Sequence, residues 1–276
     1  MNMIKLVATD LDGTLVHDRK MDPHDRKAII RLLSKGIPVV PVTTRMRYSS
    51  SEILRDVPIF DYPIVCMNGA VVNSSGWDSN DCEIWMEKTH KKDIAETISS
   101  YADEKGFEVS TIFAERKFWK VRDGQKPGSL ENDPITWLVE KNQDALEYGS
   151  PISFMMHSDR NGKDGLSDME EFSKSRCGRT VTIHRHHRMG EWIALTIYPD
   201  EINKKSALDL VCDKMGIPLK EVLAIGDDEV DKEMLESAGV GIAMGNSPEY
   251  IKDVADDVAP TCLGQGFSWA VDKYLL

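Results

Sequence analysis

The feature that most constrains the fold is a short apolar run near the amino terminus that ends in acidic residues. Ile4 to Thr9 has the length of one buried strand, and Asp10 and Asp12 follow it directly. Runs with strand-like and helix-like periodicity then alternate at 22–33, 37–42, 48–54 and 63–67. Such alternation predicts a parallel sheet with crossover helices, in which ligands bind at the carboxyl ends of the strands.

The pattern changes after about residue 77, where a Gly/Ser/Asn/Asp cluster at 74–81 marks a boundary. The sequence then predicts helices at 92–104, 134–146 and 166–174, and strands at 107–113, 117–121, 152–157 and 180–186. Alternation resumes with a strand at 192–197, a helix at 204–214 and a strand at 222–225. We therefore predict an α/β protein with a Rossmann-like, doubly wound parallel core of residues 1–82 and 190–276, interrupted by an inserted α+β cap domain of residues 83–189.

Composition narrows the classes of partner. The 276 residues include 34 Lys and Arg against 46 Asp and Glu, giving a formal charge of −12, so no overall attraction to nucleic acid or anionic lipid is expected. The five cysteines are odd in number, and the first strand leaves no room for a cleaved signal, which predicts a reducing, cytoplasmic setting. No apolar run has the length of a membrane span. We expect a small-molecule ligand, and the oligomeric state stays open.

Two acidic segments carry candidate chemistry. Asp10 and Asp12 lie two residues apart on a tight turn, so one carboxylate could bind metal and attack an electrophile while the other transfers a proton. An acidic β-turn without function is the alternative. Asp227 and Asp231 follow the strand at 222–225 and would complete an oxygen-rich Mg²⁺ site. Alone, these two could also be an exposed loop or a helix cap.

Polar residues end other predicted strands. Thr43, Thr44 and Arg45 follow the run 37–42, where a hydroxyl could donate to a phosphoryl oxygen or cap a helix. Lys204 begins a helix and could face either solvent or an anion. Asn68 follows the strand at 63–67 and is either a substrate contact or a turn residue.

These segments, in this order and each at an element boundary, resemble the haloacid-dehalogenase-like superfamily of phosphotransferases. The large insert, Asn68-Gly69-Ala70 and the segment 243–246 resemble its Cof-type subfamily. The resemblance implies a phosphoric monoester hydrolase that uses Mg²⁺ and an aspartyl-phosphate intermediate to hydrolyse a small phosphorylated metabolite, most often a sugar phosphate. A phosphosugar mutase using the same intermediate, or a phosphoester-binding protein with weak catalysis, are the alternatives.

The resemblance also assigns roles to matching positions. It implies that Asp10 is the nucleophile, Asp12 the general acid/base, Thr43 the phosphate-binding hydroxyl and Lys204 the lysine that holds nucleophile and phosphate. The implied metal ligands are Asp10, the backbone carbonyl of Asp12, Asp227 and Asp231, the last acting directly or through water. Thr44, Arg45 and Asn68 are candidate substrate contacts.

Three positions depart from the subfamily pattern. Thr44 stands where a glycine is usual, Lys205 stands where a glycine often follows the motif lysine, and Val230 stands where an asparagine usually precedes the last motif aspartate. Valine cannot donate a hydrogen bond, and such a loss costs about 1–3 kcal/mol. We therefore expect a slower or differently specific enzyme.

Overall fold

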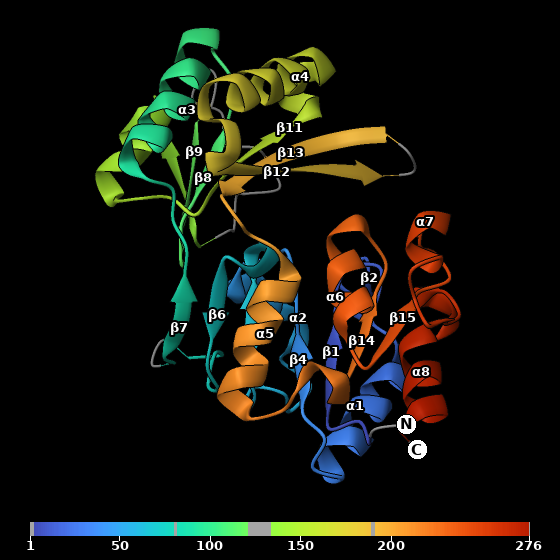
Figure 1. Cartoon of the computed structure of the whole chain (residues 1–276). Helices are drawn as coiled ribbons and strands as arrows, with labels where there is room; N and C mark the ends of the chain where they lie inside the picture. Colours follow the sequence, from blue (N-terminus) through green and yellow to red (C-terminus); the bar gives the residue numbers. More distant parts are fainter. Residues whose placement is uncertain (1–2, 80–81, 121–133, 189–190, 276) are drawn as a thin grey trace. The chain divides into compact units, whose positions relative to one another are not determined.

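A parallel sheet forms the centre of the first of two units in the computed structural model, which describes residues 3–79, 82–120, 134–188 and 191–275 (Figure 1). The strand order is β16-β15-β14-β1-β4, and all four pairings are parallel. The strands are β1 (Leu6–Thr9), β4 (Val39–Pro41), β14 (Val222–Gly226), β15 (Val240–Ala243) and β16 (Asp257–Val258). The chain passes from β1 to β4 on one side of β1 and later returns to β14 on the other side of β1. The strand order therefore reverses between β1 and β14, which is the topological switch point where ligands bind in such sheets.

Helices cover the two faces of this sheet. Leu6 and Ala8 of β1 pack in one cluster with Ala207, Leu208 and Met234 from the helices, whereas Val7, which points to the opposite face, is also fully buried. The helices are α1 (Pro23–Ser34), α2 (Arg47–Leu54), α5 (Lys204–Met215), α6 (Lys232–Ser237), α7 (Glu249–Lys252) and α8 (Gly266–Tyr274). The α/β, doubly wound core predicted from the sequence is confirmed.

Short antiparallel pairs extend the first unit. Strands β2 (Val16–His17) and β3 (Lys20–Met21) form a hairpin after the first acidic turn. Strand β5 (Ile64–Cys66) joins the main sheet through one parallel bridge between Val42 and Val65, and it pairs antiparallel with β6 (Val71–Asn73). Strand β7 (Ile84–Glu87) completes this three-stranded sheet.

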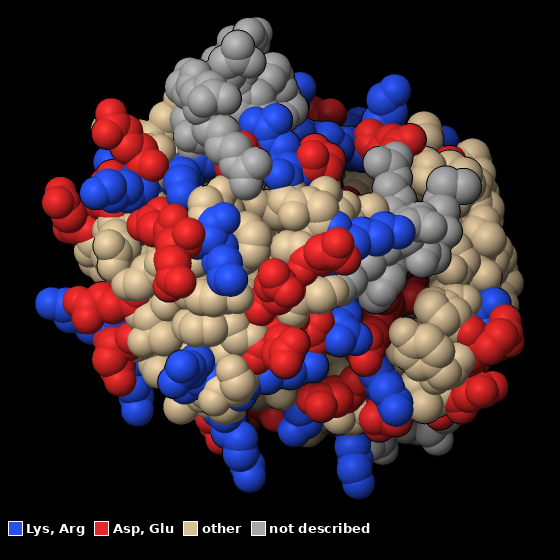
Figure 2. Space-filling view, turned by 90° about the horizontal axis from the view of Figure 1, so that it is seen from above, with Lys and Arg blue, Asp and Glu red and all other residues tan. Residues whose placement is uncertain are grey.

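The second unit spans residues 87–202 and has its own six-stranded sheet in the order β10-β9-β8-β11-β13-β12. Its strands are β8 (Ser110–Ile112), β9 (Lys117–Lys120), β10 (Thr136–Val139), β11 (Ser153–His157), β12 (Val181–Arg188) and β13 (Glu191–Pro199). Phe154, Met156 and Leu195 pack with residues of α3 (Lys92–Lys105) and α4 (Ser158–Cys177) to form its core. Lys and Arg lie among Asp and Glu on the face of the molecule shown in Figure 2.

One predicted element of this region was wrong, and one predicted strand belongs to a different sheet. Residues 134–146 were predicted to form a helix, but they contain β10, which pairs parallel with β9, and the start of the 3-10 helix Asn142–Tyr148. The β-rich composition of 136–139 and the partner strand outweigh the helical spacing. The strand at 192–197 was predicted for the core, but it lies within β13 and pairs antiparallel with β11 and β12.

The compact units are therefore residues 1–86 with 203–276, and residues 87–202, whereas the predicted boundaries were after 82 and 189. The hairpin β12–β13 explains the difference at the second boundary, because it binds residues 191–199 to the second sheet. Residue 121, the predicted end of one strand, lies outside the described residues. Among the described residues, every helix is too short or too polar to cross a bilayer.

Candidate active site

A buried lysine joins two aspartates at the carboxyl edge of the main sheet. Asp10 follows β1 and is 5% exposed, and Lys204, the first residue of α5, is fully buried. The Lys204 Nζ donates to Asp10 Oδ1 at 2.5 Å and to Asp231 Oδ1 at 2.7 Å. Asn203 fixes this end of α5, since its Oδ1 accepts the Ser206 backbone N–H at 2.7 Å. The alternative in which Lys204 faces solvent does not apply.

Asp231 has both of its oxygens engaged. Its Oδ2 accepts the backbone N–H groups of Asp227 and Asp228 at 3.0 and 3.1 Å, while Oδ1 holds Lys204. A Cβ at Gly226 would lie 2.5 Å from the Asp231 side chain, so the close approach depends on glycine. Asp231 therefore fixes the turn after β14 and the position of the lysine.

Asp227 is held by groups from two other loops. Thr14 Oγ1 donates to its Oδ1 at 2.8 Å, and Asn246 Nδ2 donates to its Oδ2 at 3.1 Å and to the Gly13 carbonyl at 3.0 Å. Gly13 has a φ of 88°, and a Cβ there would lie 2.2 Å from Asp227 Oδ2. Thr14 and Asn246 were not among the predicted site residues. Both lie in segments that the sequence singled out, but their partners lie far away in the chain.

The electrostatics of this cluster favour a divalent cation. Asp10, Asp227 and Asp231 each offer one carboxylate oxygen, and these oxygens lie within 4.8 Å of one another. Burial raises the pKa of Asp10 to about 7, against the attraction of Lys204, and burial with Asp10 and Asp231 raises the pKa of Asp227 to about 8. Burial opposes the charge of Lys204, but Asp10 and Asp231 outweigh it and raise its pKa.

One ammonium group thus faces three carboxylates in a buried site. A second cation would relieve this repulsion, and the hard oxygen donors are the ligands that Mg²⁺ prefers. The donor set of Asp10, Asp227 and Asp231 therefore fits Mg²⁺.

The remaining predicted residues follow β4 and β5. Thr43 is fully buried, and its carbonyl accepts the Asn68 N–H at 3.0 Å. Asn68 has a φ of 59°, and its buried Oδ1 has no hydrogen-bond partner among the described residues. Thr44 is half-buried beside them. Arg45 does not extend toward solvent but donates from Nε and Nη2 to the two oxygens of Asp12, at 2.5 and 2.6 Å.

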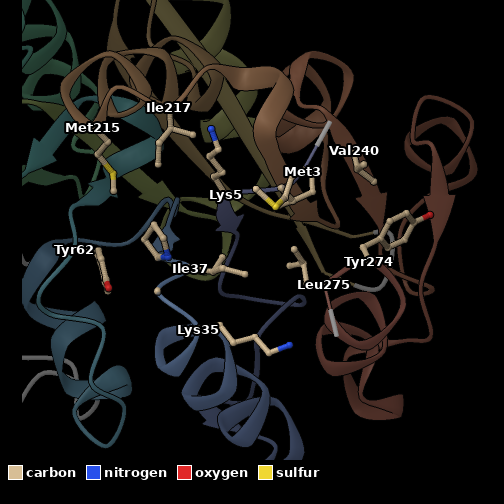
Figure 3. A pocket seen from close by; sticks show the side chains of 13 residues that line it. Met3, Lys5, Lys35, Ile37, Tyr62, Met215, Ile217, Val240, Tyr274 and Leu275 are labelled. Carbon is tan, nitrogen blue, oxygen red and sulfur yellow. The ribbon is translucent and has the colours of Figure 1, made fainter. Parts of the chain in front are cut away.

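A cavity of about 950 Å³ lies at the opposite end of the sheet (Figure 3). Its lining residues include Met3, Ile37, Tyr62, Ile217 and Leu275, which lie near the amino ends of the strands or at the end of α8. The lining is mostly apolar and has no carboxylate among the described residues. This cavity therefore lies apart from the acidic site and shares none of its carboxylates.

Comparison with known proteins agrees with this architecture. Residues 7–270 match the family model of haloacid dehalogenase-like hydrolases. A 5-amino-6-(5-phospho-D-ribitylamino)uracil phosphatase of Bacillus subtilis is 26% identical over 99% of this chain and 96% of its own length. A phosphoglycolate phosphatase of Methanobrevibacter smithii is 23% identical over 99% of each protein.

Solved structures share the fold. A haloacid dehalogenase-like hydrolase from Bacteroides thetaiotaomicron superposes with a TM-score of 0.83 at 22% identity, covering 98% of this chain and 99% of that one. A sugar phosphatase of haloacid dehalogenase subclass IIB gives a TM-score of 0.79 at 20% identity, covering 98% of each.

The chain belongs to the haloacid dehalogenase-like hydrolases, as the resemblance of its motifs implied. It is therefore an enzyme of this family, and the names of its relatives are consistent with a phosphoric monoester hydrolase.

Proposed function

We propose that this protein is a Mg²⁺-dependent phosphatase that hydrolyses a small phosphomonoester through an aspartyl-phosphate on Asp10. The observation that carries the proposal is the buried Lys204 ammonium, shared by Asp10 and Asp231 beside a third carboxylate. A carboxylate nucleophile repels the dianionic phosphate monoester, so fixed positive charge is needed where the two meet. Lys204 supplies part of that charge, and its contact with Asp10 Oδ1 leaves Oδ2 available for attack.

The chain's residues divide the reaction into two displacements. In the first, Asp10 Oδ2 forms a bond to phosphorus, the ester P–O bond breaks, and Asp12 gives a proton to the departing alcohol oxygen. In the second, water attacks the phosphorus, Asp12 takes its proton, and the bond from phosphorus to Asp10 breaks to release phosphate. The Thr43 hydroxyl and the Lys204 ammonium are our proposed donors to the phosphoryl oxygens.

Asp10, Asp227 and Asp231 line the site that we propose for Mg²⁺. When bound, this ion supplies charge neutralisation for nucleophile and phosphate. Both Asp231 oxygens already accept hydrogen bonds, so we propose that Asp231 acts mainly by orienting Lys204 and the Asp227 turn. We extend the same positioning role to Asn246 and Thr14, which hold the Asp227 carboxylate.

For the substrate we propose a sugar phosphate or a similar small metabolite. The support is the solved sugar phosphatase and the small phosphorylated compounds named for the relatives. We also propose that the inserted unit, residues 87–202, is the cap domain that selects the alcohol part of the ester. Thr44 and Asn68 remain candidate contacts for that part.

The test is Mg²⁺-dependent phosphate release from a panel of sugar phosphates, nucleotides and aryl phosphates. Wild type should release phosphate, Asp10→Asn should release none, and Asp253→Asn, which changes an exposed carboxylate of the same unit, should match wild type. Incubation with excess chelator should abolish release. Isomerised ester in place of free phosphate would replace the phosphatase with a mutase, and a folded, inactive wild type would refute the proposal.

A further inference from the structure

The Arg45 guanidinium donates hydrogen bonds to both carboxylate oxygens of Asp12, a two-bond contact that we call the fork. This contact bears on proton transfer by Asp12. The geometry is bidentate, with Nε to Oδ2 at 2.5 Å and Nη2 to Oδ1 at 2.6 Å. We propose that Arg45 is a positioning residue that orients the Asp12 carboxyl for proton transfer to the departing alcohol, and not a substrate contact. This inference rests on the proposed phosphatase function.

Arg45 is the more buried partner of the pair, and its backbone is hydrogen-bonded on both sides. Its backbone N–H donates to Thr43 Oγ1 at 3.1 Å, and its carbonyl accepts the Met67 N–H at 2.9 Å. The Arg45 side chain is 19% exposed, against 46% for Asp12. Among the described residues, Arg45 provides every side-chain hydrogen bond that the Asp12 carboxylate accepts. The more buried guanidinium therefore sets the orientation of the more exposed carboxylate.

The fork also determines how Asp12 can carry a proton. A protonated carboxyl oxygen cannot keep accepting a full hydrogen bond along the direction of its own O–H, so one of the two contacts with Arg45 must open. The other contact then holds the second oxygen, and the O–H is aimed away from the guanidinium. As the ester P–O bond breaks, this proton passes to the alcohol oxygen. In the second displacement the same oxygen takes the proton of the attacking water, and the fork can close again.

A positioning role predicts a dependence on the leaving group. Phenolate is a poor leaving group that needs the proton, whereas p-nitrophenolate leaves as a stabilised anion and needs little help. General acid catalysis contributes about 10²–10⁴-fold when it is required. Phenyl and p-nitrophenyl phosphate both lack sugar hydroxyls, so loss of a sugar contact would leave the ratio of their rates unchanged.

The experiment measures kcat and KM of both esters for wild type, Arg45→Ala, Arg45→Lys and Asp12→Asn. For Arg45→Ala we expect kcat/KM, which reports the first displacement alone, to fall by about 30-fold or more on phenyl phosphate and by about 3-fold or less on p-nitrophenyl phosphate. Arg45→Lys, which keeps the charge but loses the fork, should show the same selective loss at smaller amplitude. Arg26→Ala is the matched control, because it removes an arginine that pairs with Asp56 at 2.8 Å on the surface, and it should leave the ratio unchanged.

A double-mutant cycle separates action through Asp12 from direct action. If Arg45 works through Asp12, Arg45→Ala added to Asp12→Asn should lower the rate on phenyl phosphate by less than about 3-fold further. Equal losses of kcat/KM on the two esters, or full additivity of the two substitutions, would overturn the inference while wild-type turnover still upheld the phosphatase. No release of phosphate by wild type would refute the proposed function and the inference with it.

Discussion

Asp25, a buried carboxylate outside the candidate active site, allows a quantitative test of how far burial raises the pKa of a carboxyl group in this protein. Asp25 lies in the first turn of α1 with its side chain fully buried. Its Oδ1 accepts the Ser268 backbone N–H at the start of α8, at 2.9 Å, and its Oδ2 has no partner among the described residues. Burial raises the pKa of Asp25 to about 6, although the Ser268 hydrogen bond opposes this. The folded protein therefore holds the Asp25 proton more tightly than the unfolded chain does.

The contribution of Asp25 to folding stability decreases as pH rises. An acid whose pKa is higher in the folded state contributes stability that is complete below pH 3.8 and is lost as pH rises through about 6. A difference of about 2 pKa units corresponds to about 3 kcal/mol over the whole range, about half of it between pH 5 and 8. The amino terminus of α8 favours the anion and reduces this, so we expect about 1 kcal/mol between pH 5 and 8.

Asp25→Asn removes the charge and keeps an acceptor for the Ser268 N–H. The melting temperature of this variant minus that of wild type should therefore rise by about 2–4 °C between pH 5 and pH 8. Any change in stability caused by the amide group itself is the same at both pH values, so it does not affect the change in this difference between pH 5 and pH 8. Asp253→Asn, at an exposed site, serves as the control and should show no such rise. A difference that is the same at both pH values would show that burial does not raise the pKa of Asp25.

Three further outcomes follow from single contacts. Burial lowers the pKa of His90 to about 4, so the neutral histidine contributes stability that is lost as pH falls from about 6.5 through 4. The melting temperature of the His90→Gln variant should therefore depend less on pH across that window than the melting temperature of wild type does. Gly13→Ala should sharply weaken Mg²⁺ binding, measured by calorimetry, because its Cβ would meet Asp227 Oδ2 at 2.2 Å. Asn203→Ala should lower the free energy of unfolding by about 1 kcal/mol, measured in urea, since the cap of α5 is lost.

The sequence predicts the core well because its signals are local. The run before Asp10 is short, apolar and bounded by a turn, and it forms β1 at the centre of the sheet. Each predicted site residue of the core lies just after a strand or at a helix start, and parallel strands bring such positions to one edge. The contact between Asp10 and Lys204, 194 residues apart, follows from that topology.

The second unit shows where local signals fail. Residues 136–139 carry apolar side chains compatible with either a helix or a strand, and the parallel pairing with β9 decides between them. Residues 192–197 are recognisable as a strand, but their sheet is not, because the sequence does not reveal that the hairpin with β12 keeps them in the second unit. Which strands pair with one another depends on tertiary packing, which periodicity does not encode.

The site illustrates the same limit at the level of single side chains. Arg45 and Asp12 could each be placed at the end of a strand, yet the bidentate contact between them depends on rotamers and on a backbone anchored by Thr43 and Met67. Its position after a core strand made Arg45 a candidate substrate contact on sequence alone. In the structure Arg45 instead contacts Asp12, the carboxylate that we propose as the acid/base.

The cluster of Asp10, Asp227, Asp231 and Lys204 lowers folding stability, so residues of these types at these positions indicate function. The motifs that carry them can therefore be recognised in the sequence. Burial, together with the surplus negative charge of three carboxylates around one ammonium, raises the pKa values of Asp10 and Asp227. Folding stability would favour apolar residues here, so the charges are a cost that the rest of the core offsets. Substrate specificity leaves no comparable signature in the sequence, because it depends on side chains that fold without strain whichever ester they contact.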